Sequence, residues 1–162
     1  MNVLVIDGQG GGIGRALVEK LKSAVPSARV TAVGANATAT AAMLRAGADA
    51  GATGENAVKV ACRQADVIVG ALGIVLADAM LGEITPEMAR AVGASAAQRV
   101  LIPVQRCGTQ IAGVQDAPMA QRIDEAVRAV AALNAGNPRP GGRAGIARGR
   151  GARGRGRGVF GG

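Results

Sequence analysis

The stretch VLVIDGQGGGIG, residues Val3–Gly14, decides the fold of this chain. Its first four residues, Val3–Ile6, form a continuous apolar run, which is typical of a strand buried on both faces of a parallel sheet. Five glycines follow within seven residues, and Ile13–Lys22 then has the apolar spacing of a helix. A strand, a glycine turn and a helix in this order predict the first βα unit of a nucleotide-binding sheet.

The glycine loop Gly8–Gly14 has the composition that phosphate binding needs. Glycines let the backbone approach the anion, because a Cβ would stand in its way. The helix that follows directs its free N–H groups and the positive end of its dipole at the same point. We therefore predict that the loop binds the phosphate of a nucleotide or dinucleotide. NAD or NADP is a candidate cofactor, another nucleotide is an open alternative, and a turn that only packs the strand against the helix is the structural alternative.

Polar residues at two predicted strand ends extend this site. Asp7 ends the first strand at the carboxyl edge of the sheet, where it either holds a ribose or a metal-bound phosphate or caps the glycine turn. Asn36 follows the second strand, where NAD-binding proteins usually place an acid for the ribose hydroxyls, and Thr38 is the predicted cap of the next helix. The predicted cofactor contacts are Asp7, Gly8, Gln9, Gly10, Gly11, Gly12, Ile13, Gly14 and Asn36.

Predicted strands and helices alternate along the rest of the chain. Further strands are predicted over Arg29–Gly34, Ala48–Ala52, Asp66–Gly70 and Arg99–Val104, with Gln110–Val114 as an additional candidate. Helices are predicted over Thr38–Ala46, which Gly47 ends, over Asn56–Gln64, from Thr85-Pro86-Glu87 onward, and over Pro118–Leu133. The alternation predicts an α/β fold: a doubly wound parallel sheet, Rossmann-like, in a single domain with strand order 3-2-1-4-5.

The net charge of +8 is unevenly divided. Residues 138–162 hold seven arginines and no acidic residue, which leaves twelve basic and eleven acidic residues for residues 1–137. We predict a Rossmann-like nucleotide-binding domain over 1–137 and a disordered Arg/Gly-rich tail over 138–162, because the tail has no apolar periodicity. Such tails bind RNA through phosphate contacts and arginine stacking, so RNA is a candidate partner. A solvated tail without a ligand is the alternative.

The composition also excludes several classes of site and location. The chain has no histidine, which excludes histidine relays and histidine metal ligands, and we expect no metal. Cys62 and Cys107 lack CxxC spacing, which fits a reducing cytoplasm better than a disulfide framework. Neither a signal peptide nor a membrane-spanning run is present, so we expect a cytoplasmic protein without a membrane partner. A domain this short needs a second subunit to cover its site, which predicts a homodimer.

The sequence is compatible both with an enzyme and with a binding protein. Asp78 and Glu83 are the best carboxylates for general acid–base work, with ordinary surface acids as the alternative. The polar cluster Thr53–Asn56 is either beside the pocket or the first turn of a helix, and Cys107 is either near a substrate or an incidental thiol. The function predicted is a nucleotide-binding or sensor module. A minimal NAD(P)-dependent oxidoreductase and an RNA-associated protein are the alternatives.

The spacing of Gly8, Gly12 and Gly14 resembles the cofactor loop of short-chain dehydrogenases. Asp66–Ile74 is similar to the fourth-strand segment of that family, although Gly70–Gly73 reads GALG where an Asn-Asn-Ala-Gly run is usual. The family catalyses with a tyrosine and a lysine four residues apart, but this chain has no tyrosine and no lysine after Lys59. The resemblance therefore implies the cofactor-binding half of such an enzyme without its chemistry.

A closer resemblance covers residues 1 to about 133. Val5–Gly14, Ala46–Asp49, Gly51–Ala57 and Ala77–Pro86 together resemble an uncharacterised bacterial family of short Rossmann-like proteins, a domain of unknown function. This resemblance implies the fold and carries no activity or site residues. The Arg/Gly tail is not part of the pattern.

Overall fold

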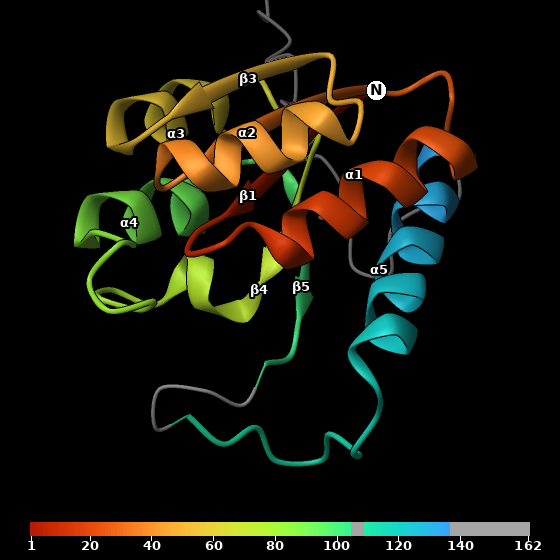
Figure 1. Cartoon of the computed structure of the whole chain (residues 1–162). Coiled ribbons are helices and arrows are strands. Elements are labelled where there is room, and N and C mark those ends of the chain that lie inside the picture. The colour runs from red at the N-terminus through yellow and green to blue at the C-terminus, as the bar shows by residue number, and fades with distance from the viewer. Residues whose placement is uncertain (105–108, 137–162) are drawn as a thin grey trace, which may run out of the picture.

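The computed structural model describes residues 1–104 and 109–136. These residues form a five-stranded, all-parallel sheet in the order β3-β2-β1-β4-β5, which confirms the predicted fold and strand order (Figure 1). The strands are β1 (Asn2–Asp7), β2 (Arg29–Gly34), β3 (Ala50–Thr53), β4 (Val67–Ala71) and β5 (Gln98–Ile102). The apolar run of β1 lies at the centre, where Val3 is paired with Val30 of β2 and Val67 of β4.

Helices cover both faces of the sheet (Figure 1). One face packs against α1, α2 and α5, and the other against α3, α4 and the short 3-10 helix η1. Their bounds are α1 (Gly12–Ala24), α2 (Ala37–Arg45), α3 (Glu55–Ala61), η1 (Leu72–Val75), α4 (Pro86–Ala94) and α5 (Met119–Asn134). The doubly wound arrangement leaves the carboxyl ends of the strands free to carry a site.

Side chains of β1 alternate between the two halves of the core. Val3 and Val5 pack toward α1 and α5, whereas Leu4 and Ile6 pack toward η1 and α4, and all four are buried. This is the period-two pattern of a strand that is covered on both faces.

The buried hydrophobic residues are aliphatic or sulfur-containing, because the sequence has no tryptophan or tyrosine and a single phenylalanine. Burial raises the pKa of the Cys62 thiol to about 11.

Two of the predicted local features are wrong. Gln110–Val114 forms no strand but a turn, in which Gly113 has a φ of 79°, outside the range that an extended strand adopts. The N-cap of α2 is Asn36 instead of Thr38, because the Asn36 side chain accepts a hydrogen bond from the Ala39 amide at 2.9 Å.

Other boundaries differ by a few residues, and part of the chain falls outside the description. The third strand begins at Ala50, and α3 ends at Ala61. Gly47 follows the end of α2 with a φ of 101°, as expected of a helix stop. Cys107 and the Arg/Gly tail lie outside the described residues. Within the described ranges, no helix has the length and apolar character to cross a membrane.

Candidate functional site

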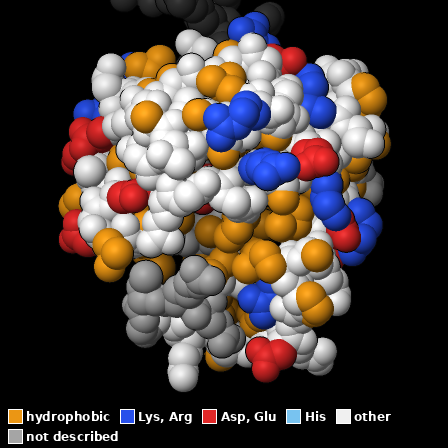
Figure 2. Space-filling model, viewed as in Figure 1, with side chains coloured by type: hydrophobic (Ala, Val, Ile, Leu, Met, Phe, Trp, Pro, Cys, Tyr) orange, Lys and Arg blue, Asp and Glu red, His pale blue; other side chains and the backbone are white. Residues whose placement is uncertain are grey.

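A cavity of about 360 Å³ lies at the carboxyl ends of β1 and β4. The chain order of the sheet reverses between these two strands, and open α/β sheets bind their ligands at such a point. Figure 2 shows the hydrophobic side chains gathered in a hollow on this face. The side chains of the lining are almost all apolar: Ile13, Ala71, Leu76, Ala79, Met80, Val104 and Met119. The remaining lining residues are Asp7, Gly8, Gln9, Gly10, Gly11, Gly12 and Gly73.

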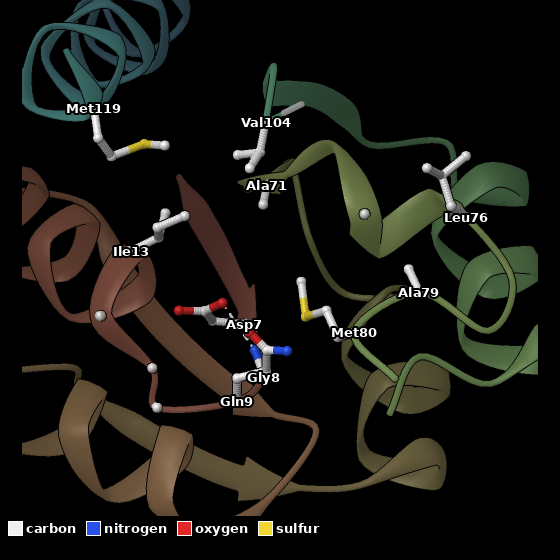
Figure 3. A pocket seen from close by; sticks show the side chains of 14 residues that line it. Asp7, Gly8, Gln9, Ile13, Ala71, Leu76, Ala79, Met80, Val104 and Met119 are labelled. Carbon is white, nitrogen blue, oxygen red and sulfur yellow. Dashed lines mark hydrogen bonds between the residues drawn. The ribbon is translucent and has the colours of Figure 1, made fainter. Parts of the chain in front are cut away.

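The cavity walls come from segments far apart in the sequence (Figure 3). Ile13 and Met119 lie on one side, and Leu76, Ala79 and Met80 lie on the other. Between these walls, Asp7 and the glycine loop form the edge nearest β1. The arrangement offers an apolar space beside a backbone surface that is rich in amide groups.

Four of the five glycines of the loop fall into two groups. A Cβ on Gly11, whose φ is 71°, would lie 2.7 Å from Ala39 Cα, and one on Gly14 would lie 2.6 Å from Met43 Sδ. Packing within the protein therefore requires glycine at these two positions. A Cβ on Gly10 or Gly12 would meet nothing within 4 Å, and neither residue has a left-handed φ. The fold itself does not require glycine at positions 10 and 12.

The first amides of α1 differ in whether they have a hydrogen-bond acceptor. Gly12 and Ile13 open the helix, so their N–H groups have no acceptor within it, and none of the described residues supplies one. The Gly14 amide donates to Asp7 Oδ2 at 2.7 Å, and the Gly8 amide donates to Asp7 Oδ1 at 2.8 Å. Asp7 therefore caps the glycine turn, which was one of its two predicted roles.

Asp7 is the titratable side chain that lines the cavity; no other described lining residue is titratable. Only 5% of its surface is exposed. Burial raises the pKa of its carboxyl group, the hydrogen bonds from the Gly14 and Gly8 amides oppose this shift, and the nearby charge of Glu83 adds to it. Asp7 thus lies at the same edge of the cavity as the Gly12 and Ile13 amides.

Strained backbone is concentrated in two loops at the site. Among the described residues, the non-glycine residues with a positive φ are Gln9 in the glycine loop and Asp78, Met80 and Leu81 in the segment after η1. Left-handed backbone in such residues costs free energy and is commonly retained at binding sites. Leu81 is also 94% exposed, an unusual environment for a leucine.

Glu83 joins the two loops at the end of β2. Its Oε2 atom accepts hydrogen bonds from the Gln9 amide at 2.7 Å and from Asn36 Nδ2 at 2.9 Å. Asn36 Nδ2 also donates to the Gln9 carbonyl oxygen at 2.9 Å. The structure thus brings together Asn36, predicted as a cofactor contact, and Glu83, predicted as an acid–base residue. Glu83 is a contact of the glycine loop that the sequence did not indicate.

The other polar candidates lie elsewhere. Asp78 is exposed and does not line the cavity. Within the Thr53–Asn56 cluster, Glu55 accepts a hydrogen bond from Thr85 Oγ1, and Thr53 Oγ1 is 2.7 Å from Thr40 Oγ1. These contacts tie neighbouring elements together away from the cavity. In the part of the chain that the structure describes, no three His, Cys, Asp or Glu residues come together as a metal site.

A second groove of about 560 Å³ runs between α1 and α2. It shares Gly10 and Gly12 with the cavity, and Arg15 and Arg45 line it together with Glu19. Neither arginine is in an ion pair with any described residue. The groove therefore places two positive charges on the outer side of the glycine loop.

Comparison with known proteins adds a family without an activity. A family model described as "Domain of unknown function (DUF3842)" matches residues 2–135. The match spans the whole sheet and its helices, in agreement with the resemblance seen in the sequence motifs. No curated protein and no solved structure matches the chain.

Proposed function

We propose that this chain, which belongs to the family described as a domain of unknown function (DUF3842), binds the phosphate of a nucleotide or dinucleotide at its glycine loop. The single observation that carries the proposal is the open space at Gly10 and Gly12. The fold does not need glycine there, but a ligand that approaches the backbone closely does. The residues that would meet such a ligand also line the cavity.

The amides of Gly12 and Ile13 are the proposed phosphate donors. They have no acceptor among the described residues, and they stand at the positive end of the α1 dipole. Asp7 has already taken the third amide of the helix, that of Gly14. We therefore expect a phosphate to contact the first two amides, beside a carboxyl group whose pKa is raised.

The apolar cavity suggests what the remainder of the ligand is. Its volume of about 360 Å³ falls within the range of about 300–1,000 Å³ that is typical of small-molecule sites. Apolar side chains on two sides suit the flat face of a base or of a nicotinamide ring. NAD or NADP is the ligand that we propose first, with a mononucleotide as the alternative.

We propose binding, as a sensor or carrier module, in preference to turnover. Asp7 is the titratable group of the cavity lining, and two backbone amides hold both of its oxygen atoms. Among the described lining residues, only this buried carboxyl group could act as the proton donor or acceptor of a minimal NAD(P)-dependent oxidoreductase. No observation favours that second function.

The test compares Gly12→Ala and Gly12→Asp with the control Gly93→Ala. Gly93 is an exposed glycine of α4, and a Cβ at this position would meet nothing within 4 Å. It therefore matches Gly12 as a helical glycine in open space, but it lies away from the cavity. Thermal shifts and isothermal titration with NAD, NADP, ATP and AMP would be measured on each protein. We expect wild type and Gly93→Ala to bind at least one of these nucleotides equally well.

Both Gly12 variants are expected to fold, and Gly12→Asp should lose more nucleotide affinity than Gly12→Ala. Gly12→Ala places a methyl group in the phosphate space and should weaken binding, and Gly12→Asp adds a negative charge there and should abolish it. Failure of all four nucleotides to bind wild type would contradict the proposal. Undiminished binding by Gly12→Asp would place the phosphate elsewhere.

A further inference from the structure

The end of β2 lacks the acidic side chain that usually receives the ribose in a dinucleotide-binding sheet. The strand ends at Gly34, and Ala35 and Asn36 follow. A carboxylate nevertheless lies at this place in the folded protein. It belongs to Glu83, which the chain supplies from the segment between η1 and α4.

The position of Glu83 is fixed from two sides. Its Oε2 atom is 2.7 Å from the Gln9 amide nitrogen and 2.9 Å from Asn36 Nδ2. A Cβ on Gly8 would lie 2.7 Å from the same oxygen and 3.4 Å from Ala35 Cβ. Glu83 thus lies between the glycine loop and the end of β2, beside the backbone that carries the proposed phosphate site.

Glu83 keeps hydrogen-bonding capacity that Asn36 has lost. A carboxylate offers about four lone-pair sites. Oε2 uses two of them, and Oε1 accepts no hydrogen bond from any described residue. Asn36 Nδ2 donates to both Gln9 O and Glu83, and Asn36 Oδ1 caps α2. Asn36 is therefore a positioning residue, and Glu83 is the group free to accept from a ligand.

We infer that Glu83 accepts hydrogen bonds from the ribose diol of the bound nucleotide, so that the site selects a free 2′-hydroxyl. The inference rests on the proposed function, because the phosphate must first be placed at the glycine loop. A hydroxyl group donates to a carboxylate, whereas a 2′-phosphate would bring a second negative charge against it. The ligand class is then a nucleotide with an unmodified ribose, such as NAD or ATP, and not NADP.

The groove between α1 and α2, which Arg15 and Arg45 line, would instead favour NADP. Arg15 and Arg45 line the outer side of Gly10 and Gly12, whereas Glu83 contacts Gln9 and Asn36. A 2′-phosphate that reached these arginines would be favoured. The preference between NAD and NADP therefore decides which of the two flanks of the loop receives the ribose.

The experiment measures binding of two ligand pairs by isothermal titration. NAD is compared with NADP, and ATP with its 2′-deoxy analogue, on wild type, Glu83→Gln, Glu83→Ala and the control Glu87→Gln. Glu87 lies on α4 and pairs with Arg90, away from the cavity lining. Wild type should bind NAD and ATP roughly tenfold or more tightly than NADP and the deoxy analogue, as expected for loss of a hydrogen bond to a charged group.

The variants separate contact from charge. Glu83→Gln keeps the shape of the side chain and removes its charge. The difference in affinity between NAD and NADP should therefore become smaller, while the affinity for ATP changes little. Glu83→Ala removes the acceptor, so ATP and its deoxy analogue should bind with equal affinity. The control Glu87→Gln should keep the wild-type affinity ratios of NAD to NADP and of ATP to its deoxy analogue. Should Glu83→Ala fail to fold, the same two affinity ratios measured on Glu83→Gln still test the inference.

The outcomes that overturn the inference are distinct from those that overturn the proposed function. Equal or tighter binding of NADP by wild type overturns the selection for a free 2′-hydroxyl, although nucleotide binding itself stands. So does an ATP preference that survives in Glu83→Ala. Absence of binding by all four nucleotides overturns the proposed function and this inference with it.

Discussion

At the scale of single residues, Asp7 shows how the protein uses its own carboxyl group beside the proposed anion site. Its two oxygen atoms accept from the amides of Gly8 and Gly14. These bonds hold the glycine turn against the start of α1 and keep the Gly14 amide satisfied. Burial of the same carboxyl group raises its pKa, so the turn is held at the expense of a poorly hydrated charge.

The raised pKa of Asp7 predicts a definite pH dependence of stability. The carboxyl group takes up its proton more readily in the folded state than in the unfolded state. Its contribution to the free energy of unfolding is therefore fully present below the unfolded-state pKa. That contribution is lost as the pH rises through the folded-state pKa. Asp7→Asn offers one acceptor oxygen to two amides and should be less stable than wild type by about 1–3 kcal/mol.

Urea unfolding of wild type and Asp7→Asn across a pH series measures this effect. The stability advantage of wild type should be largest at acid pH and should shrink toward neutral pH. An advantage that grows with pH would mean that the two amide bonds outweigh burial and that the folded-state pKa is lowered.

At the scale of elements, the close approach of β1 and β4 depends on a glycine. A Cβ on Gly70 would lie 2.5 Å from the Ile6 carbonyl oxygen and 3.1 Å from Ile74 Cδ1. The Ile6 carbonyl oxygen belongs to the backbone of the central strand, so it cannot move aside as the end of a flexible side chain can. Gly70 therefore lets β4 pack against β1 and η1 at the point where the cavity begins.

We predict that Gly70→Ala lowers the free energy of unfolding by about 1–3 kcal/mol, because it overpacks a buried strand. Gly93→Ala, in open space on α4, should instead stabilise the protein by about 0.4–1 kcal/mol. Denaturant unfolding of both variants measures the difference. Equal effects of the two substitutions would show that β4 can shift away from β1 at little cost.

The sheet was predictable because its central strands have strong local signals. Val3–Ile6 and Asp66–Gly70 are apolar runs, and such runs indicate strands covered on both faces. Gln110–Val114 has a similar composition, but a left-handed Gly113 ends any extension there. Asn36 and Thr38 can both cap a helix, and only the position of the Ala39 amide decides between them.

Only the part of the site that consecutive residues form was predictable from the sequence. The glycine loop forms from consecutive residues, so its proposed role follows from spacing. Met80, Val104 and Met119 reach the cavity from three separate segments, and no periodicity marks them as neighbours of β1. Glu83 was visible as a carboxylate, but its contacts with Gln9 and Asn36 depend on a loop that folds back across the sheet edge.

At the scale of the whole molecule, charge is separated along the sequence. Residues 1–137 are close to neutral, and the seven arginines of residues 138–162 carry most of the excess. We propose that any RNA affinity belongs to this arginine-rich segment and that nucleotide binding belongs to the folded domain. The homodimer likewise stays a prediction.

Truncation after Asn137 tests this division. If all seven arginines meet phosphates of single-stranded RNA, the logarithm of the affinity should fall against the logarithm of salt with a slope of about −5. The truncated protein should lose RNA binding and keep its nucleotide affinity. Fluorescence anisotropy with RNA at several salt concentrations measures the first effect. RNA binding that persists without the arginines would assign it to the domain.

The absence of aromatic side chains from the packed domain has an optical consequence. Tryptophan and tyrosine are absent and the only aromatic residue is Phe160, so the polypeptide is nearly transparent in the near ultraviolet. An adenine ring absorbs strongly there. A nucleotide carried through purification would therefore dominate the absorption spectrum of the protein, and the ligand would be detectable against this low background without any label.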